Sequence, residues 1–297
     1  MTTSTEEHIA TELASQPETW ARAVAMTAEQ RLLPAPGQKV AMVGCGTSWF
    51  MAQSYAALRE SAGHGVTDAF SASEAFVDRD YDAIIALTRS GTTTEVLDIV
   101  KAHRGRTRII GIVGDTTSPF VDEVDDLITL PFADEQSVVQ TRFATTALAF
   151  LRASLGEDLS TAIADAELAV ADELDDGIIG AEQITFLGRG WTVGLAHEAA
   201  LKMREATQSW TESYPAMEYR HGPISIAAPG RITWMFGAAP TGIREDVLAT
   251  GARFETSALD PLANLVRVHK LALLRARAKG LNPDLPRSLT RSVILDS

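Results

Sequence analysis

The chain has 297 residues, of which 45% are hydrophobic, and a formal net charge of −13 at pH 7. This content can fill the core of one large or two medium domains, which excludes a disordered chain. The negative charge disfavours nonspecific binding to nucleic acid or to an anionic membrane, because both require a positive field. A small anionic ligand stays compatible, provided that backbone N–H groups, hydroxyls and a few cations hold it locally.

The sequence also bears on the compartment and on bound metal. No window approaches the roughly 18 consecutive apolar residues of a membrane span, and residues 1–7 lack the basic-then-apolar order of a signal peptide. The single cysteine, Cys45, can form no internal disulfide and supplies no cysteine-rich metal set. We therefore expect a soluble, unexported, cytoplasmic protein that has no bound metal.

Apolar runs alternate with segments of helical period from about residue 39 onward, which predicts βα units around a largely parallel sheet. A helix around residues 18–31 precedes them. The predicted strands of the first half are 39–43, 66–70, 82–87, 108–113 and 127–130, and the predicted helices are 49–59 and 94–102. The turn 44–48 follows the first of these strands, and the polar loop 88–93 follows the third.

The pattern then begins again. After an acidic, alanine-rich helical stretch at about 159–175, the strand 183–187 leads into Gly188-Arg189-Gly190 and another helix. A strand–GxG–helix unit at both Gly44 and Gly188 indicates two similar halves. Only 232–236 is a further convincing strand, and the stretch between Phe236 and Pro261 is short for a full domain. The number of strands in the second half therefore stays open.

The loop after the third strand carries five hydroxyl residues within positions 88–94. It opens a helix, so its hydroxyls lie beside backbone N–H donors at the positive helix terminus, where anions bind. An ordinary N-cap is the alternative, but one hydroxyl is enough for a cap. Open α/β sheets bind ligands at the carboxyl ends of their strands, which favours a phosphate site here.

The turn Gly44-Cys45-Gly46-Thr47-Ser48 ends the first strand at the same edge of the sheet, so Ser48 can reach the same ligand. A dinucleotide site is a weaker interpretation. Trp49 stands where the third glycine of that motif belongs, and a lone GxG is a common tight turn. A P-loop is excluded, because the sequence has no Gly-Lys-Ser/Thr.

The helix after Gly190 places Glu198, Lys202 and Glu205 at i, i+4 and i+7, on one side. Its apolar stripe lies elsewhere, so the charged stripe is free to face solvent or a cleft. The apolar stripe consists of Ala196, Ala199, Ala200, Met203 and Ala206. From spacing alone a solvated face is the more common outcome.

The segment Arg220-His221-Gly222-Pro223 predicts a loop that enters a helix, with Pro223 in the first turn. An imidazole at that boundary suits acid–base chemistry because it titrates near neutrality. One histidine among six is weak support, and a surface position is the alternative.

Taken together, these segments resemble the SIS (sugar isomerase) family, in particular the isomerase half of glutamine-dependent glucosamine-6-phosphate synthase and its free-standing relatives. The resemblance covers nearly the whole chain. The segments that carry it are Gln16-Pro17, 44–48, 89–93, 138–142, 187–190, 198–205, 219–223 and 282–289.

The resemblance implies an α/β fold of two flavodoxin-like, three-layer SIS domains with parallel sheets. We assign 1–34 to an N-terminal helical segment and 35–155 to the first, phosphate-binding domain. Residues 156–280 form the linking helix and the second, abbreviated domain, and 281–297 form a tail over the active site. The resemblance implies no cofactor.

Family members also imply roles for single residues. Glu205 aligns with the carboxylate that moves a proton between C1 and C2 of an open-chain sugar, and Lys202 with a lysine that stabilises oxyanion charge. His221 aligns with the residue that assists ring opening and comes from the neighbouring subunit, which implies a homodimer. The implied binding residues are Ser48, Thr88, Arg89, Ser90 and Thr93 for phosphate, and Glu135, Val138 and Arg291 toward the sugar.

Three departures limit the transfer. The 297 residues contain no glutaminase segment, so we expect no use of glutamine as an ammonia donor. Arg291 stands where the synthase has a lysine, and it keeps the charge but cannot form a Schiff base. Gln140 replaces a serine before Thr141.

The leading hypothesis is therefore a phosphosugar isomerase, or an amino-sugar-phosphate deaminase or deglycase, that acts on a hexose 6-phosphate. The sequence does not choose among these reactions because they share one proton shuttle. The alternative from another class is a noncatalytic phosphosugar sensor, which would not require Lys202, Glu205 and His221 together.

Overall fold

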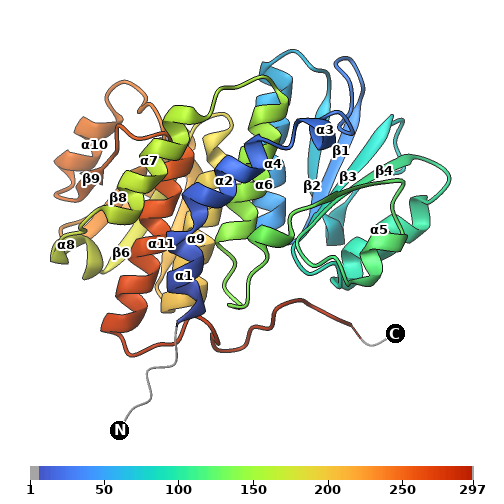
Figure 1. The fold of residues 1–297 in the computed structure, drawn as a ribbon. Coiled ribbons are helices and arrows are strands. Elements are labelled where there is room, and N and C mark those ends of the chain that lie inside the picture. The colour runs from blue at the N-terminus through green and yellow to red at the C-terminus, as the bar shows by residue number, and fades with distance from the viewer. Residues whose placement is uncertain (1–6, 296–297) are drawn as a thin grey trace, which may run out of the picture.

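The structure, a computed structural model, describes residues 7–295. The predicted α/β class is confirmed, since two parallel sheets lie on either side of a layer of helices (Figure 1). The expectation that no signal peptide begins the chain falls mostly on residues 1–6, which lie outside the described residues. Within residues 7–295, no helix has both the length and the apolar character needed to cross a membrane.

The first sheet has the strand order β2-β1-β3-β4-β5, and all neighbours run parallel. Its strands are β1 Val40–Gly44, β2 Thr67–Ser71, β3 Ala83–Thr88, β4 Arg108–Val113 and β5 Asp126–Thr129. All five were predicted to within one residue at each end. The central strands β1, β3 and β4 are recognisable because parallel strands buried on both faces form continuous apolar runs, and the edge strands β2 and β5 each carry two adjacent apolar residues, Ala69-Phe70 and Leu127-Ile128.

The second sheet has four strands in the order β7-β6-β8-β9, again all parallel. They are β6 Gln183–Gly188, β7 Thr211–Pro215, β8 Arg231–Met235 and β9 Arg253–Glu255. The two strands that the sequence did not reveal, β7 and β9, lie at the edges. An edge strand is partly exposed and needs no apolar run, so its polar sequence gives no strand pattern.

The helices before the first strand are α1 His8–Ala14, α2 Gln16–Val24 and α3 Thr27–Gln30. The single helix predicted over 18–31 is therefore wrong in extent. Met26 leaves the helical region with φ −78° and ψ 57°, which separates α2 from α3. The other α-helices are α4 Thr47–Ser61, α5 Thr94–His103, α6 Arg142–Ser154, α7 Ser160–Ala171, α8 Asp176–Ile179, α9 Thr192–Thr207, α10 Ile243–Ala249 and α11 Pro261–Ala278.

One hydrophobic cluster joins the two sheets. The inward side chains of β3, Ile85 and Leu87, belong to the same buried cluster as Phe186 of β6, through residues of α4, α6, α9 and α11. Ile84 of β3 points to the opposite face, where it packs in a separate cluster with Val96 of α5. Because the central helices serve both sheets, the division of the chain into two domains stays a prediction.

Helix α4 of the first half and helix α9 of the second approach each other closely at Gly194. A Cβ added there would lie 2.3 Å from the Phe50 carbonyl oxygen and 2.3 Å from the Ser54 hydroxyl oxygen. Glycine is therefore required by packing rather than by an unusual backbone conformation. This contact sets how closely α9 lies to the loops of the first sheet.

We expect Gly194→Ala to lower the free energy of unfolding by about 1–3 kcal/mol, the usual cost of inserting a methyl group into a packed interface. Urea denaturation measures this. Helix propensity alone favours alanine by about 1 kcal/mol, so a variant more stable than the wild type would show that α4 and α9 separate without cost.

Candidate active site

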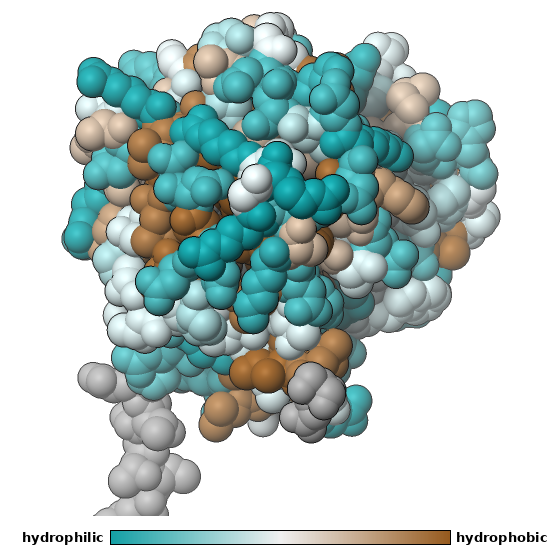
Figure 2. Space-filling model, turned by 90° about the vertical axis from the view of Figure 1, so that its right-hand side faces the viewer, coloured by the Kyte–Doolittle hydropathy of each residue, from teal (hydrophilic) through white to brown (hydrophobic). Residues whose placement is uncertain are grey.

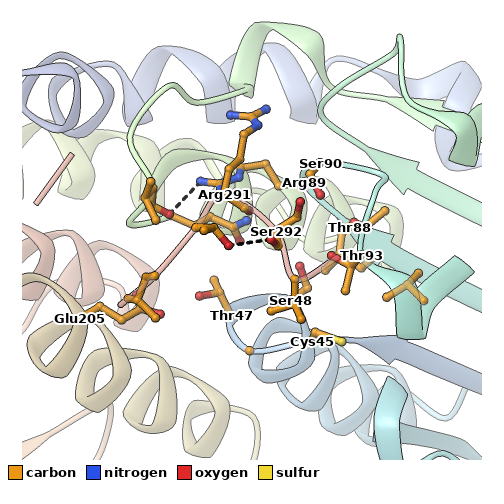
Figure 3. Close-up of a pocket in the computed structure, with 18 of the residues that line it drawn as sticks. Cys45, Thr47, Ser48, Thr88, Arg89, Ser90, Thr93, Glu205, Arg291 and Ser292 are labelled. Carbon is orange, nitrogen blue, oxygen red and sulfur yellow. Dashed lines mark hydrogen bonds between the residues drawn. The ribbon is translucent and has the colours of Figure 1, made fainter. Parts of the chain in front are cut away.

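A cavity of about 200 Å³ opens where β1 and β3 end, at the carboxyl edge of the first sheet (Figure 3). Ligands of open α/β sheets bind at this edge because the loops that leave the strands converge there. The walls come from the β1–α4 turn, the β3–α5 loop, the loop before α6, helix α9 and the tail segment 289–293. The first sheet and a helix of the second half therefore meet in one cavity.

The β3–α5 loop curls around its own hydroxyl groups. The Thr88 hydroxyl accepts a hydrogen bond from the Gly91 N–H at 3.1 Å, and the Ser90 hydroxyl accepts one from the Thr92 N–H at 3.3 Å. Gly91 has φ 63°, and a Cβ there would lie 1.9 Å from the Ser118 hydroxyl oxygen. The loop therefore requires glycine at its bend.

Two hydroxyls that line the cavity are available to a ligand. Thr93 is the N-cap residue of α5, but its side chain makes no capping hydrogen bond, so the ordinary-cap alternative is wrong for this hydroxyl. Ser48, in the first turn of α4, also lines the cavity and its hydroxyl bonds to no described residue. Two helix N-termini and two free hydroxyls at one cavity suit an anion.

Arg89 is buried, and its guanidinium is engaged by the protein. It donates to the carbonyl oxygens of Ser137 at 2.9 Å, Val138 at 3.3 Å and Arg291 at 2.8 Å. Burial lowers the pKa of Arg89, and the nearby Glu135 carboxylate opposes that shift. Arg89 therefore joins the loop before α6 to the tail, and direct contact with phosphate stays a prediction.

Of the two residues expected near the sugar, Val138 lines the cavity and Glu135 does not. The Glu135 carboxylate is fully buried and accepts hydrogen bonds from the backbone N–H groups of Thr141, Arg142 and Phe143. Burial raises its pKa. In this structure Glu135 holds the start of α6.

Helix α9 brings a buried charge cluster to the opposite wall. Lys202 is 1% exposed and Glu198 is 0% exposed, so a solvated face is excluded for both. The Lys202 ammonium donates to Glu205 Oε2 and lies 3.6 Å from Glu198 Oε1. The Glu205 side chain is 19% exposed and lines the cavity together with Lys202.

Burial and charge act differently on the three groups of this cluster. Burial, with the charge of Glu205 in addition, raises the pKa of Glu198 to about 8. Burial acts to lower the pKa of Lys202, but Glu198 and Glu205 together outweigh it and raise that pKa. Lys202 is therefore a permanent cation in the cavity wall.

His221 does not reach the cavity of its own chain. It ends the 3₁₀ helix η4, Glu218–His221, and its side chain is exposed. The predicted loop is confirmed in part: Gly222 has φ 135°, and Pro223 begins a second 3₁₀ helix, η5 Pro223–Ile226. The predicted turn is therefore present as short 3₁₀ helices.

The C-terminal tail lies along the cavity and is held by the β3–α5 loop. The Ser292 and Thr92 hydroxyls bond at 2.8 Å, and the Thr94 N–H donates to the Val293 carbonyl at 3.2 Å. Arg291 lines the cavity and donates to Asp134 Oδ1 at 2.6 Å. The tail also has exposed apolar side chains, which are Val293, Ile294 and Leu295. Figure 2 shows a cluster of apolar side chains at the lower edge of the molecule.

The cavity also contains residues that the sequence did not mark as site residues. Thr47, Cys45 and Gln140 are among them, although each lies in a segment that carried the family resemblance. Burial raises the pKa of Cys45 to about 11, so its thiol is uncharged and a poor nucleophile at neutral pH. The described part of the chain contains no group of three or more His, Cys, Asp or Glu side chains placed to hold a metal ion.

The fold matches that of solved structures of phosphosugar isomerases and deaminases. A glucosamine-6-phosphate deaminase from Thermotoga maritima superposes with a TM-score of 0.85, covering 97% of this chain and 100% of that one at 22% identity. The C-terminal domain of glucosamine-fructose-6-phosphate aminotransferase from Francisella tularensis superposes with a TM-score of 0.81, covering 95% of this chain and 99% of that one at 18% identity. Tagatose-6-phosphate ketose/aldose isomerase from Escherichia coli superposes with a TM-score of 0.81, covering 100% of this chain and 98% of that one at 17% identity.

The sequence relatives agree with these structures. Glutamine–fructose-6-phosphate aminotransferase [isomerizing] from Pyrobaculum aerophilum is 26% identical over 87% of this chain and 52% of its own length. The chain spans about half the length of the curated relatives that it matches. No protein-family model matches the chain. The resemblance to the SIS family inferred from the motifs is confirmed by these relatives.

We expect Thr93→Val and Ser48→Ala each to weaken binding of a sugar phosphate by about tenfold or more. A hydrogen bond to a charged group contributes about 1.5–3 kcal/mol, and about 1.4 kcal/mol is a factor of ten. Isothermal titration calorimetry with a hexose 6-phosphate measures the change. Ser73→Ala, an exposed hydroxyl outside the cavity, is the control and should leave affinity unchanged. Unchanged affinity in both cavity variants would contradict the phosphate site.

Proposed function

We propose that this protein moves a proton between C1 and C2 of a hexose 6-phosphate, as a phosphosugar isomerase or as an amino-sugar-phosphate deaminase or deglycase. One observation carries the proposal: a single cavity joins the hydroxyl-rich β3–α5 loop to the buried Lys202–Glu205 pair. An anion site at one end and a carboxylate–ammonium pair at the other suit a substrate with phosphate at one end and a carbonyl at the other.

The phosphate end rests on the N-termini of α4 and α5. In the proposal, the free hydroxyls of Ser48 and Thr93 donate to phosphate oxygens, with the loop hydroxyls of Thr88 and Ser90 beside them. Arg89 orders the loops around this end and adds positive charge. Short-range donors of this kind outweigh the unfavourable net charge of the protein.

The chemical end rests on α9. Glu205 is the proposed base, because it is the one carboxylate of the cluster that is both partly exposed and in the cavity wall. It removes a proton from C2 or C1 of the open-chain sugar and returns it to the neighbouring carbon. The Lys202 ammonium offsets the negative charge that develops on the enediolate oxygen.

The proposal extends to a homodimer in the cytoplasm. His221 is exposed and lies outside the cavity of its own chain, which fits an imidazole that acts in the cavity of a neighbouring subunit. Arg291 cannot form a Schiff base with a ketose, so ring opening depends on acid–base groups. A binding protein without catalysis has no use for a lysine buried between two carboxyls, which favours an enzyme over a sensor.

Solvent exchange tests the proposal. In heavy water, the protein should introduce deuterium at C1 or C2 of a reactive hexose phosphate, detected by NMR, because the shuttled proton exchanges with solvent. A panel of hexose 6-phosphates and their 2-amino and glycated derivatives, assayed for product and for released ammonia, separates isomerase from deaminase and deglycase. Binding without deuterium incorporation across the panel would support the sensor instead.

Glu205→Gln tests the proposed base. We expect kcat to fall by at least about 100-fold, since general acid–base catalysis contributes about 10²–10⁴-fold. Phosphosugar affinity should stay close to that of the wild type, because the anion site lies at the other end. Glu167→Gln, an exposed carboxylate on α7, is the control. Retained turnover would remove Glu205 as the base.

Lys202→Ala tests the proposed oxyanion partner. Charge on the enediolate develops only in the transition state, so the variant should lose kcat by a larger factor than it loses affinity. Steady-state kinetics and calorimetry on the same preparation separate these two effects. An equal loss in both would assign Lys202 to ground-state binding.

A further inference from the structure

Glu198 is a buried carboxyl for which the proposed reaction has so far no use. Its side chain is 0% exposed, and neither carboxylate oxygen has a hydrogen-bond partner among the described residues. The Lys202 ammonium lies 3.6 Å from its Oε1, and the Thr47 hydroxyl of α4 faces the carboxyl. Glu198 does not line the cavity, so it lies behind Lys202 as seen from a ligand.

Such a group is costly for the fold. A buried polar atom without a hydrogen bond costs free energy, and a buried ion pair of poor geometry is often replaced by apolar residues without loss of stability. Stability of α9 therefore does not explain the carboxyl. Buried groups of this kind, when they lie beside a cavity, are candidates for a role in the chemistry.

Among the titratable groups around Glu198, Lys202 is the one that forms an ion pair with it. On its own helix Arg204 and Glu205 also act on it electrostatically. From α11, the fully buried His269 faces the cluster, and burial lowers the pKa of this imidazole to about 3, so it is uncharged. His269 therefore does not supply a competing charge at neutral pH.

The other elements packed on α9 add no charge at this point. Helix α4 contributes the Thr47 hydroxyl, which faces the Glu198 carboxyl. Strand β6, Gln183–Gly188, carries no titratable residue. Strand β7 carries Glu212 and Tyr214, which hydrogen-bond to each other at 2.8 Å.

We propose that Glu198 is a positioning residue, whose buried carboxyl fixes the Lys202 ammonium from behind and keeps it charged while Glu205 exchanges protons with the substrate. The inference rests on the proposed function. The charge of Glu205 is one cause of the raised pKa of Glu198, so when Glu205 carries the substrate proton this repulsion ends and ionisation of Glu198, 3.6 Å from the Lys202 ammonium, becomes more favourable. Lys202 thus stays directed at the position where the enediolate oxygen forms.

Two variants of Glu198 test the proposal. Glu198→Gln keeps the shape and removes the ionisable carboxyl, and we expect kcat to fall about tenfold or more with KM within about twofold, as for a small misplacement of a catalytic group. Glu198→Met removes the buried polar atoms, so it should unfold at a higher temperature than the wild type and still turn over slowly. A merely structural role would lower stability and kcat together. Glu255→Gln, a buried carboxylate of β9 outside the cavity, is the matched control.

The pH dependence of stability supplies a readout that needs no substrate. The pKa of Glu198 rises on folding from 4.5 to about 8, so its contribution is full below about pH 4.5 and is lost as the pH rises through about 8. The unfolding temperature of Glu198→Gln relative to the wild type should therefore increase across this range.

The outcomes separate the two proposals. Wild-type turnover with an unchanged kcat in both Glu198 variants would remove the positioning role and leave the proposed function intact. Absence of turnover in the wild type on every phosphosugar would remove the proposed function and the positioning role with it. Turnover in the wild type, slow variants, a more stable Glu198→Met and the expected pH trend would together support both.

Discussion

The proposed active site depends on one buried cation. Lys202 lies in the wall between the two halves of the protein, almost without solvent, and the nearby carboxyls of Glu198 and Glu205 raise its pKa. A lone ammonium could not keep its charge there, because burial favours the neutral amine. The i, i+4, i+7 spacing on α9 places one carboxyl on either side of it, so the geometry of about two helix turns sets the proposed chemical end of the cavity.

The rest of the fold brings the proposed phosphate site opposite that cation. Gly194 lets α9 approach α4, the Gly91 bend shapes the β3–α5 loop, and Arg89 joins the loop before α6 to the tail. These contacts are internal to the protein, so they hold the two ends of the cavity in place. Preorganisation of this kind is what electrostatic stabilisation of a developing oxyanion requires.

The first half of the fold could be predicted from the sequence because its central strands are buried on both faces and its site residues follow those strands directly. The edge strands β7 and β9 could not, since polar, partly exposed strands have no apolar pattern. For α9, the residue spacing predicted that Glu198 and Lys202 share one face of the helix, but it favoured exposure of that face to solvent. In the structure both side chains are buried, and Lys202 lines the same cavity as residues of α4 and of the tail. Burial of a charged stripe is a tertiary property, and local sequence does not contain it. The burial of Glu135 outside the cavity lining could not be predicted for the same reason, because its partners are backbone N–H groups of α6.

The proposed function requires a substrate that spans the cavity from the β3–α5 loop to Glu205. A crystal structure with an open-chain hexitol 6-phosphate, which has no carbonyl and cannot react, tests this directly. The account predicts phosphate oxygens within hydrogen-bond distance of the Ser48 and Thr93 hydroxyls and the C1–C2 end about 3–3.5 Å from the Glu205 carboxylate. A phosphate bound elsewhere, or a sugar chain directed away from Lys202 and Glu205, would contradict it.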